Sequence, residues 1–132
     1  MKKTLIFLIL AFTLLEASNF RDGMIYYRNG NFKEAKKSFE LAISQDKALQ
    51  ANFFLGKMYL YGKGVQIDIK KAIEYLEKVS QNGNIRADCY LAEAYIQNDT
   101  NKEKAVSLLK SGLERGAREC RKIAKLYNIN TK

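Results

Sequence analysis

The chain has 132 residues, of which 47% are hydrophobic; it contains no proline and no histidine, and its formal charge is +9. This length favours one domain with one continuous core. The absence of histidine excludes Ser-His-Asp and Cys-His catalytic machinery. The positive charge either attracts acidic partners over long range or reflects lysines on solvated helix faces.

The N-terminus has the pattern of a secretory signal peptide. Two lysines precede residues 5–15, which are apolar apart from one threonine, and the small residues Ala17 and Ser18 follow. The apolar run is shorter than the stretch of about 20 residues that spans a bilayer. We therefore predict a signal peptide over 1–17 and a periplasmic or secreted protein. The alternative is a retained N-terminal anchor, and membrane contact is expected only through an uncleaved signal peptide.

After this segment, apolar spacing predicts only helices, because no segment alternates as a strand does. The expected ranges are 19–29, 32–45, 48–61, 68–82, 85–97, 101–115 and 117–128. Three of the helix starts carry a capping residue: Asn31, Asp68 and Thr100. Asn31 and Thr100 are each followed three residues later by a glutamate, as in a capping box.

Three segments repeat one pattern, in which a small residue is followed by a tyrosine, a turn, an alanine and a large residue. The matching positions are Gly23, Gly56 and Ala92; Tyr26, Tyr59 and Tyr95; Ala35, Ala72 and Ala105; and Phe39, Leu76 and Leu109. A fourth, partial copy holds Ala124 and Tyr127. The tyrosines recur at steps of 33, 36 and 32 residues, the period of helix pairs that stack into a solenoid. We expect all these positions in the core, without a chemical role.

The repeats give the expected division of the chain. A repeat domain over 18–132 holds repeats at about 19–47, 48–83 and 84–116 and a capping helix at 117–128. The second repeat has the longest turn, with 13 residues from tyrosine to alanine against 9 and 10 in the others. Glycine permits the positive backbone angles that such a loop needs. Gly62 and Gly64 are therefore structural, and Val65 is expected to fold back onto the helix pair.

The second repeat resembles a known family. The pattern LGxxYxxGxGVxxDxxKA is present over residues 55–72 and is similar to the Sel-like repeat, a relative of the tetratricopeptide repeat. The first and third repeats lack the GxGV insertion and resemble plain tetratricopeptide units. The resemblance covers about 20–128. It implies an all-α fold, an α/α solenoid of about three and a half repeats, and an adaptor for proteins or peptides of the kind found in secreted or envelope-associated bacterial proteins.

The resemblance also implies where a partner binds, because the first helices of such repeats line the concave face. The candidate binding residues are Phe20, Met24, Tyr27, Arg28, Phe53, Lys57, Tyr61, Glu93, Gln97, Arg121 and Lys125, with Leu60, Cys89 and Ile96 at equivalent positions. This set suits a peptide with an apolar anchor and an acidic group. The alternative is that Phe53, Leu60 and Ile96 pack only against neighbouring helices. Self-association stays open because the array is short, and no nucleic acid is expected.

An enzymatic alternative comes from a secreted, cysteine-rich branch of the Sel-like family, which is associated with penicillin binding and β-lactamase activity. Ser-x-x-Lys occurs at Ser44 with Lys47 and at Ser107 with Lys110. The accompanying SDN and KTG motifs are absent. We therefore predict a scaffold rather than an enzyme, without cofactor or metal, and keep a cell-wall enzyme or glycan-binding protein as the alternative.

Cys89 and Cys120 form neither a CxxC motif nor a zinc pattern. An exported chain permits a disulfide. In the cysteine-rich branch each repeat carries its own cysteine pair; Cys120 matches one such position, but its expected partner position holds Gly112. The family's pairing is therefore not kept. A Cys89–Cys120 bridge and free or intermolecular thiols both remain open.

Overall fold

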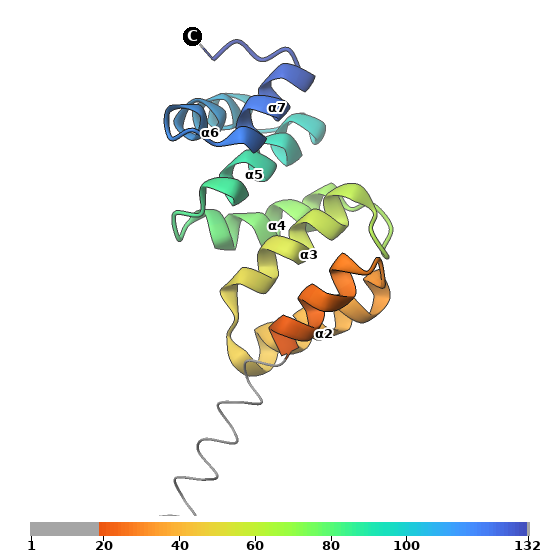
Figure 1. Cartoon of the computed structure of the whole chain (residues 1–132). Coiled ribbons are helices and arrows are strands. Elements are labelled where there is room, and N and C mark those ends of the chain that lie inside the picture. Colours follow the sequence, from red (N-terminus) through yellow and green to blue (C-terminus); the bar gives the residue numbers. More distant parts are fainter. Residues whose placement is uncertain (1–18, 132) are drawn as a thin grey trace, which may run out of the picture. The chain divides into compact units, whose positions relative to one another are not determined.

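The computed structural model describes residues 19–131, and these residues form α-helices joined by short turns, without a strand among them (Figure 1). The predicted signal peptide over 1–17 lies outside the described residues. In the described part of the chain, no helix has the length and apolar character needed to cross a membrane. The predicted fold class, an all-α helical repeat, is confirmed.

Every predicted helix is present, with ends within two residues of the expected ones. A first helix covers residues 19–28. It is followed by α2 (Phe32–Asp46), α3 (Leu49–Tyr61), α4 (Ile69–Ser80), α5 (Ile85–Gln97), α6 (Lys102–Glu114) and α7 (Arg118–Leu126).

The described residues divide into two compact units, one ending at Ala51 and one beginning at Asn52, with the boundary in the first turn of α3. This differs from the expected single continuous core. The physical reason is that repeats in such arrays contact mainly their neighbours, so that contacts are local and the chain separates readily into units.

In the first unit, the fully buried Phe39 packs against the first helix. A Cβ added to Gly23 would lie 2.6 Å from the Phe39 ring, so glycine permits this close approach. The rings of Phe20 and Tyr27 lie 5.9 and 6.3 Å from that of Phe39, centroid to centroid. The core prediction is wrong for Tyr26, which is 38% exposed, because the next residue, Tyr27, is turned toward Phe39 in its place.

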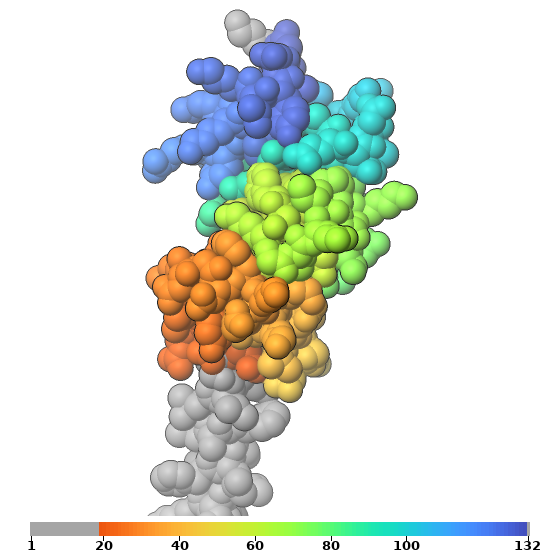
Figure 2. All heavy atoms as spheres, turned by 90° about the vertical axis from the view of Figure 1, so that its right-hand side faces the viewer, coloured from red at the N-terminus to blue at the C-terminus, as the bar shows by residue number. Residues whose placement is uncertain are grey.

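In the second unit, α5 contacts α4, α6 and α7. The positions of this unit that were predicted to lie in the core are buried: Gly56, Tyr59, Ala72, Leu76, Ala92, Tyr95, Ala105, Leu109 and Ala124. Tyr127 is only half-buried. Figure 2 shows one outer face of this unit, where long blue side chains project from the surface near its C-terminal end.

Tyr95, the tyrosine of the third repeat, also forms hydrogen bonds through its hydroxyl group. The Tyr95 ring is buried, while its hydroxyl donates to the Glu77 carboxylate on α4. Lys104 Nζ on α6 donates to the same hydroxyl over 3.1 Å. Tyr95 therefore ties its helix to both neighbouring helices at the edge of the core.

One of the three predicted caps is confirmed. The Asp68 side chain accepts a hydrogen bond of 3.0 Å from the backbone N–H of Lys71 at the start of α4. Asn31 precedes α2 but makes no side-chain capping bond. Thr100 is one residue too early, because Asn101 takes the N-cap position of α6 with a left-handed φ of 45° and also makes no capping bond.

The longer turn of the second repeat has the predicted geometry. Gly62 and Gly64 adopt φ angles of +66° and +69°, a region that glycine enters without steric cost. Val65 packs against the core cluster of the unit. The backbone N–H of Asp68 donates to the Tyr59 carbonyl over 3.0 Å and closes the loop.

Replacing Gly56 with alanine is expected to destabilise the second unit. The new Cβ would lie 2.6 Å from Cγ of Leu76, a fully buried side chain with little room to move. We expect the free energy of unfolding to fall by about 1–3 kcal/mol, measured by urea denaturation. The exposed Glu74→Ala on α4 is the control, with an expected change within about 0.5 kcal/mol. Equal stabilities for the two variants would contradict the close approach at Gly56.

Candidate functional site

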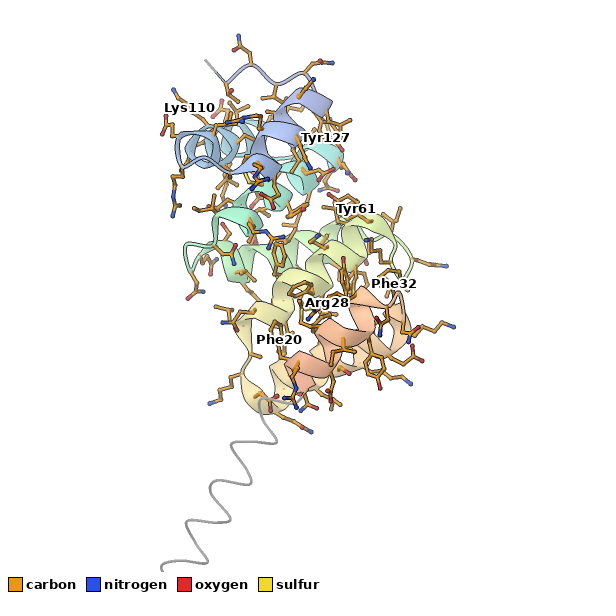
Figure 3. The ribbon with its side chains drawn as sticks, viewed as in Figure 1. Phe20, Arg28, Phe32, Tyr61, Lys110 and Tyr127 are labelled. Atoms are coloured by element: carbon orange, nitrogen blue, oxygen red, sulfur yellow. A yellow bond between two sulfur atoms is a disulfide. The ribbon has the colours of Figure 1, made fainter. Side chains whose placement is uncertain are left out.

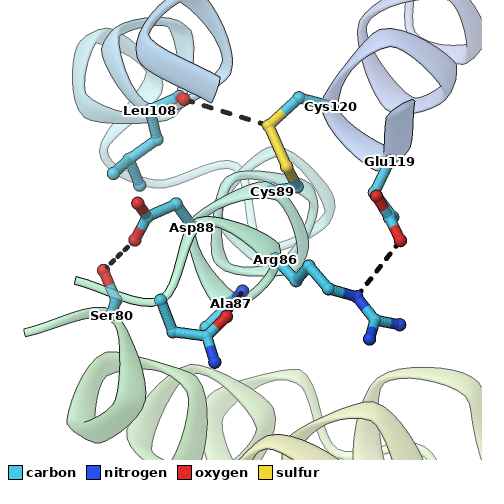
Figure 4. The surroundings of a disulfide bond; sticks show 9 residues. Ser80, Arg86, Ala87, Asp88, Cys89, Leu108, Glu119 and Cys120 are labelled. Atoms are coloured by element: carbon cyan, nitrogen blue, oxygen red, sulfur yellow. Dashed lines mark hydrogen bonds and ion pairs between the residues drawn. A yellow bond between two sulfur atoms is a disulfide. The ribbon is translucent and has the colours of Figure 1, made fainter. Parts of the chain in front are cut away.

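Helices α5 and α7 lie side by side and run in the same direction. Near their N-terminal ends, Arg86 Nε donates to Glu119 Oε1 over 3.1 Å (Figure 4). One turn further, Cys89 and Cys120 are joined by a disulfide, with their Cα atoms 4.7 Å apart. The pairing that the sequence left open is thus the one in the structure.

A buried carboxylate joins the C-terminal ends of the same helices. Glu93 on α5 is 3% exposed. It accepts hydrogen bonds from the hydroxyl of Tyr61 at the end of α3, over 2.5 Å, and from that of Tyr127 after α7, over 3.2 Å. Gln97 Nε2 also donates to Tyr127, over 2.9 Å. Figure 3 shows Tyr61 and Tyr127 on one side of this unit and Lys110 on the other.

Beside these contacts, the surface is hollowed into a groove of about 860 Å³. Its walls come from the end of α3, from α5, from the turn between α6 and α7, and from α7 itself. All the lining residues belong to the second unit. We call this feature the α5–α7 groove.

The wall of the groove around α7 is basic. Two carboxylates line the groove, and both are engaged: Glu93 with the two tyrosines and Glu119 with Arg86. On the same wall, Arg115, Arg118 and Lys122 form no ion pair with any residue in the described range 19–131. The net field inside the groove is therefore positive.

Apolar side chains lie between these charges. Ile85 and Tyr90 line the groove from α5, and Ile123 and Leu126 line it from α7. Leu126 is 68% exposed, although burying a leucine side chain contributes about 1.5–3 kcal/mol. The groove thus offers apolar contact area beside unpaired positive charge.

Only part of the predicted binding set lies in the groove. Tyr61 and Glu93 line it. Lys57 lies beside it, with Nζ 4.7 Å from the ring centre of Tyr90, and burial together with the charge of the nearby Arg86 lowers its pKa. Gln97 is exposed and does not line the groove; its side chain donates to the Tyr127 hydroxyl.

Other predicted residues are placed differently. Phe53 is 5% exposed and packs against Tyr90, and Leu60 is buried as well, in agreement with the alternative that such positions pack between helices. Arg121 and Lys125 are exposed on α7 but do not line the groove.

Four predicted residues, Phe20, Met24, Tyr27 and Arg28, belong to the first unit. Tyr27 is half-buried there, and burial raises the pKa of its phenol. Arg28 is exposed and Met24 is partly buried.

The sequence analysis missed Arg86, Tyr90, Arg118 and Lys122 as groove residues. On each helix these residues are four apart, so that they share a face. Each pair also brackets the cysteine of its helix in the sequence. The signal that identifies these residues is the cysteine pair: once Cys89 and Cys120 are joined, helical spacing around them indicates which faces of α5 and α7 lie together.

The serines of the enzymatic alternative are not part of the α5–α7 groove. Ser44 is exposed, and its hydroxyl donates to the Leu41 carbonyl of its own helix over 3.2 Å. A shallow pocket beside Ser44 is lined by α2 alone. Ser107 is exposed on α6. In the part of the chain that the structure describes, neither serine is hydrogen-bonded to the lysine three residues later, and no cluster of metal-ligating side chains is present.

The phenol of Tyr61 makes the stability of the second unit sensitive to alkaline pH. Burial, followed by the hydrogen bond to Glu93, raises the pKa of Tyr61 well above its ordinary value of 10.0. Above about pH 10 the unfolded chain therefore loses this proton while the folded chain keeps it, so the free energy of unfolding falls as pH rises.

We expect Tyr61→Phe to reduce the slope of this alkaline loss, measured by urea denaturation between about pH 9 and pH 11. The slope is compared rather than the absolute stability, since the variant also loses one hydrogen bond. Tyr26→Phe, at an exposed tyrosine of the first unit, is the control. If Tyr61→Phe loses stability with rising pH as steeply as the unmodified chain, the pKa of Tyr61 is not raised in the folded state.

Comparison with known proteins agrees with the repeat pattern. The family model "Sel1 repeat" matches residues 49–84, which include the whole LGxxYxxGxGVxxDxxKA pattern at 55–72. No solved structure matches the chain. The resemblance found in the sequence is therefore confirmed over α3, the GxGV loop and α4, and residues 49–84 of this chain are a Sel1 repeat.

Proposed function

We propose that this chain is an exported repeat scaffold that binds a protein or peptide partner in the α5–α7 groove. Sel1 repeats generally mediate protein–protein interaction. The observation that carries the proposal is the groove itself, which combines apolar side chains, among them the exposed Leu126, with three arginine and lysine side chains that form no ion pair in the described part of the chain.

The charge of the groove favours an acidic segment of the partner. Arg115, Arg118 and Lys122 lie on one wall, where a carboxylate would meet positive charge. Tyr90 and Leu126 would cover an apolar side chain of the same segment. The partner we propose is therefore a peptide segment with acidic residues next to an apolar one.

Export is the second part of the proposal. The signal-peptide pattern over 1–17 supports it, and so does the Cys89–Cys120 disulfide, because disulfides persist in oxidising compartments and are rare in the cytosol. We assign no catalytic role to the chain, since neither Ser44 nor Ser107 has a hydrogen-bonded lysine among the described residues.

Two charge reversals on α7 test the site of binding. A phage-displayed library of random peptides is selected against the oxidised chain, and the affinity of an enriched peptide is measured by fluorescence anisotropy. We expect enrichment of aspartate and glutamate next to apolar residues. Arg118→Glu/Lys122→Glu, in the groove, is expected to weaken binding about tenfold or more.

Arg121→Glu/Lys125→Glu is the matched comparison, because it changes the charge of α7 equally at residues outside the groove. We expect it to change the affinity much less. Equal losses in both variants would indicate non-specific attraction by net charge. A loss confined to the second variant would place binding on the surface predicted from sequence instead of in the groove.

Export is tested by expressing the full chain in a bacterium and sequencing the N-terminus of the product. We expect the chain in the periplasm or the medium, beginning at Ser18, because cleavage is predicted after Ala17. A product that keeps residues 1–17 and stays in the cytoplasm would refute this part of the proposal and leave the groove untouched.

A further inference from the structure

We propose that the Cys89–Cys120 disulfide is a redox latch for the α5–α7 groove: the groove is formed while the bond is closed and lost when the bond is reduced. This inference rests on the proposed function, because it makes partner binding depend on the redox state of the compartment. Its structural part, the release of α7, does not depend on any ligand.

Helix α7 is the element on which the groove depends most. It supplies Arg118, Lys122, Ile123 and Leu126 to the lining, which include two of the three positive side chains without an ion pair and the exposed Leu126. Without α7 in place, the groove would lose one wall. The opposite wall, with Tyr90 on α5 and Tyr61 on α3, would remain.

The non-covalent anchoring of α7 is limited. The helix has nine residues, fewer than the 12–15 or so at which an isolated helix becomes marginally stable. It buries Cys120, Ile123 and Ala124, and the hydroxyl of Tyr127, directly after it, donates to Glu93 and accepts from Gln97. The Arg86–Glu119 ion pair is partly exposed, with the Arg86 side chain 58% exposed, and such pairs contribute little to stability.

The disulfide lies where it can hold α7 against the rest of the unit. Both cysteines are fully buried. A Cβ at Gly112 on α6 would lie 2.2 Å from Cys120 Sγ and 3.5 Å from Cys89 Sγ, and the Leu108 carbonyl oxygen lies 4.0 Å from Cys120 Sγ (Figure 4). The bond therefore passes directly under α6 and joins α7 to α5 at the centre of the unit.

Reduction needs two electrons and two protons, and a dithiol reductant supplies them. One thiolate of the reductant attacks the sulfur of one cysteine, forms a mixed disulfide with it and releases the other cysteine as a thiolate; the second thiol then closes the reductant into a ring and releases the first cysteine. Cys89 and Cys120 end as thiols. Since both are buried, the reductant reaches them when α7 opens locally.

The structural test is hydrogen exchange on the full chain, oxidised and in excess dithiothreitol. We expect the backbone amides of α7 to exchange about tenfold faster or more in the reduced chain, while α4 and α5 keep their protection. The variant Cys89→Ala/Cys120→Ala is the control and should exchange at one rate with or without the reductant. Unchanged protection of α7, or equal loss of protection in α4 and α5, would overturn the latch.

The functional test repeats the anisotropy measurement with the selected peptide in both redox states. We expect the affinity of the reduced chain to fall at least about tenfold, with full recovery on reoxidation. Equal affinities in the two states would overturn redox control even if α7 loosens. If no peptide binds the oxidised chain, the proposed function fails, while the exchange measurement still decides whether α7 is held by the disulfide.

Discussion

Close approach between paired helices is the constraint on which this structure depends. At two places a large, fully buried side chain fills space that a glycine leaves open: Phe39 against Gly23, and Leu76 against Gly56. A helix pair closed in this way still has an uncovered apolar side, and in the second unit α5 packs against α4 and covers it. The order of small and large residues along the chain therefore sets both the packing within a pair and the stacking of pairs, and the groove follows from that stacking.

The sequence was sufficient for the helices and most of the core, because burial at helical spacing leaves a strong periodic signal in residue type. It was not sufficient where the assignment depends on which side of a helix faces its neighbours. Tyr26 was placed in the core although Tyr27 packs on Phe39. Arg118 and Lys122, which line the groove, were not singled out, whereas Arg121 and Lys125, which lie outside it, were. Such assignments depend on helix rotation, which is fixed by long-range contacts that repeat spacing does not encode.

The position of the disulfide depends on one small residue on α6. In the cysteine-rich branch weighed as an alternative, a partner for Cys120 is expected near position 112, whereas this chain has Gly112. The glycine leaves room under α6 for the Cys120 sulfur, which joins Cys89 on α5 instead. The link therefore ties neighbouring first helices, the same helices that form the groove, rather than the two helices of one pair.

The hydroxyl of Tyr95 has a consequence for how uniquely the helices are arranged. Ring burial alone would be satisfied by any large apolar residue, which leaves the rotation of α5 only loosely defined. The bonds to Glu77 on α4 and Lys104 on α6 are directional, and they are made at the edge of the core, where water competes for each partner. A neighbouring arrangement of the same helices could keep the apolar contacts but would exchange these directional bonds for bonds to water, so the hydroxyl favours one packing among several of similar burial.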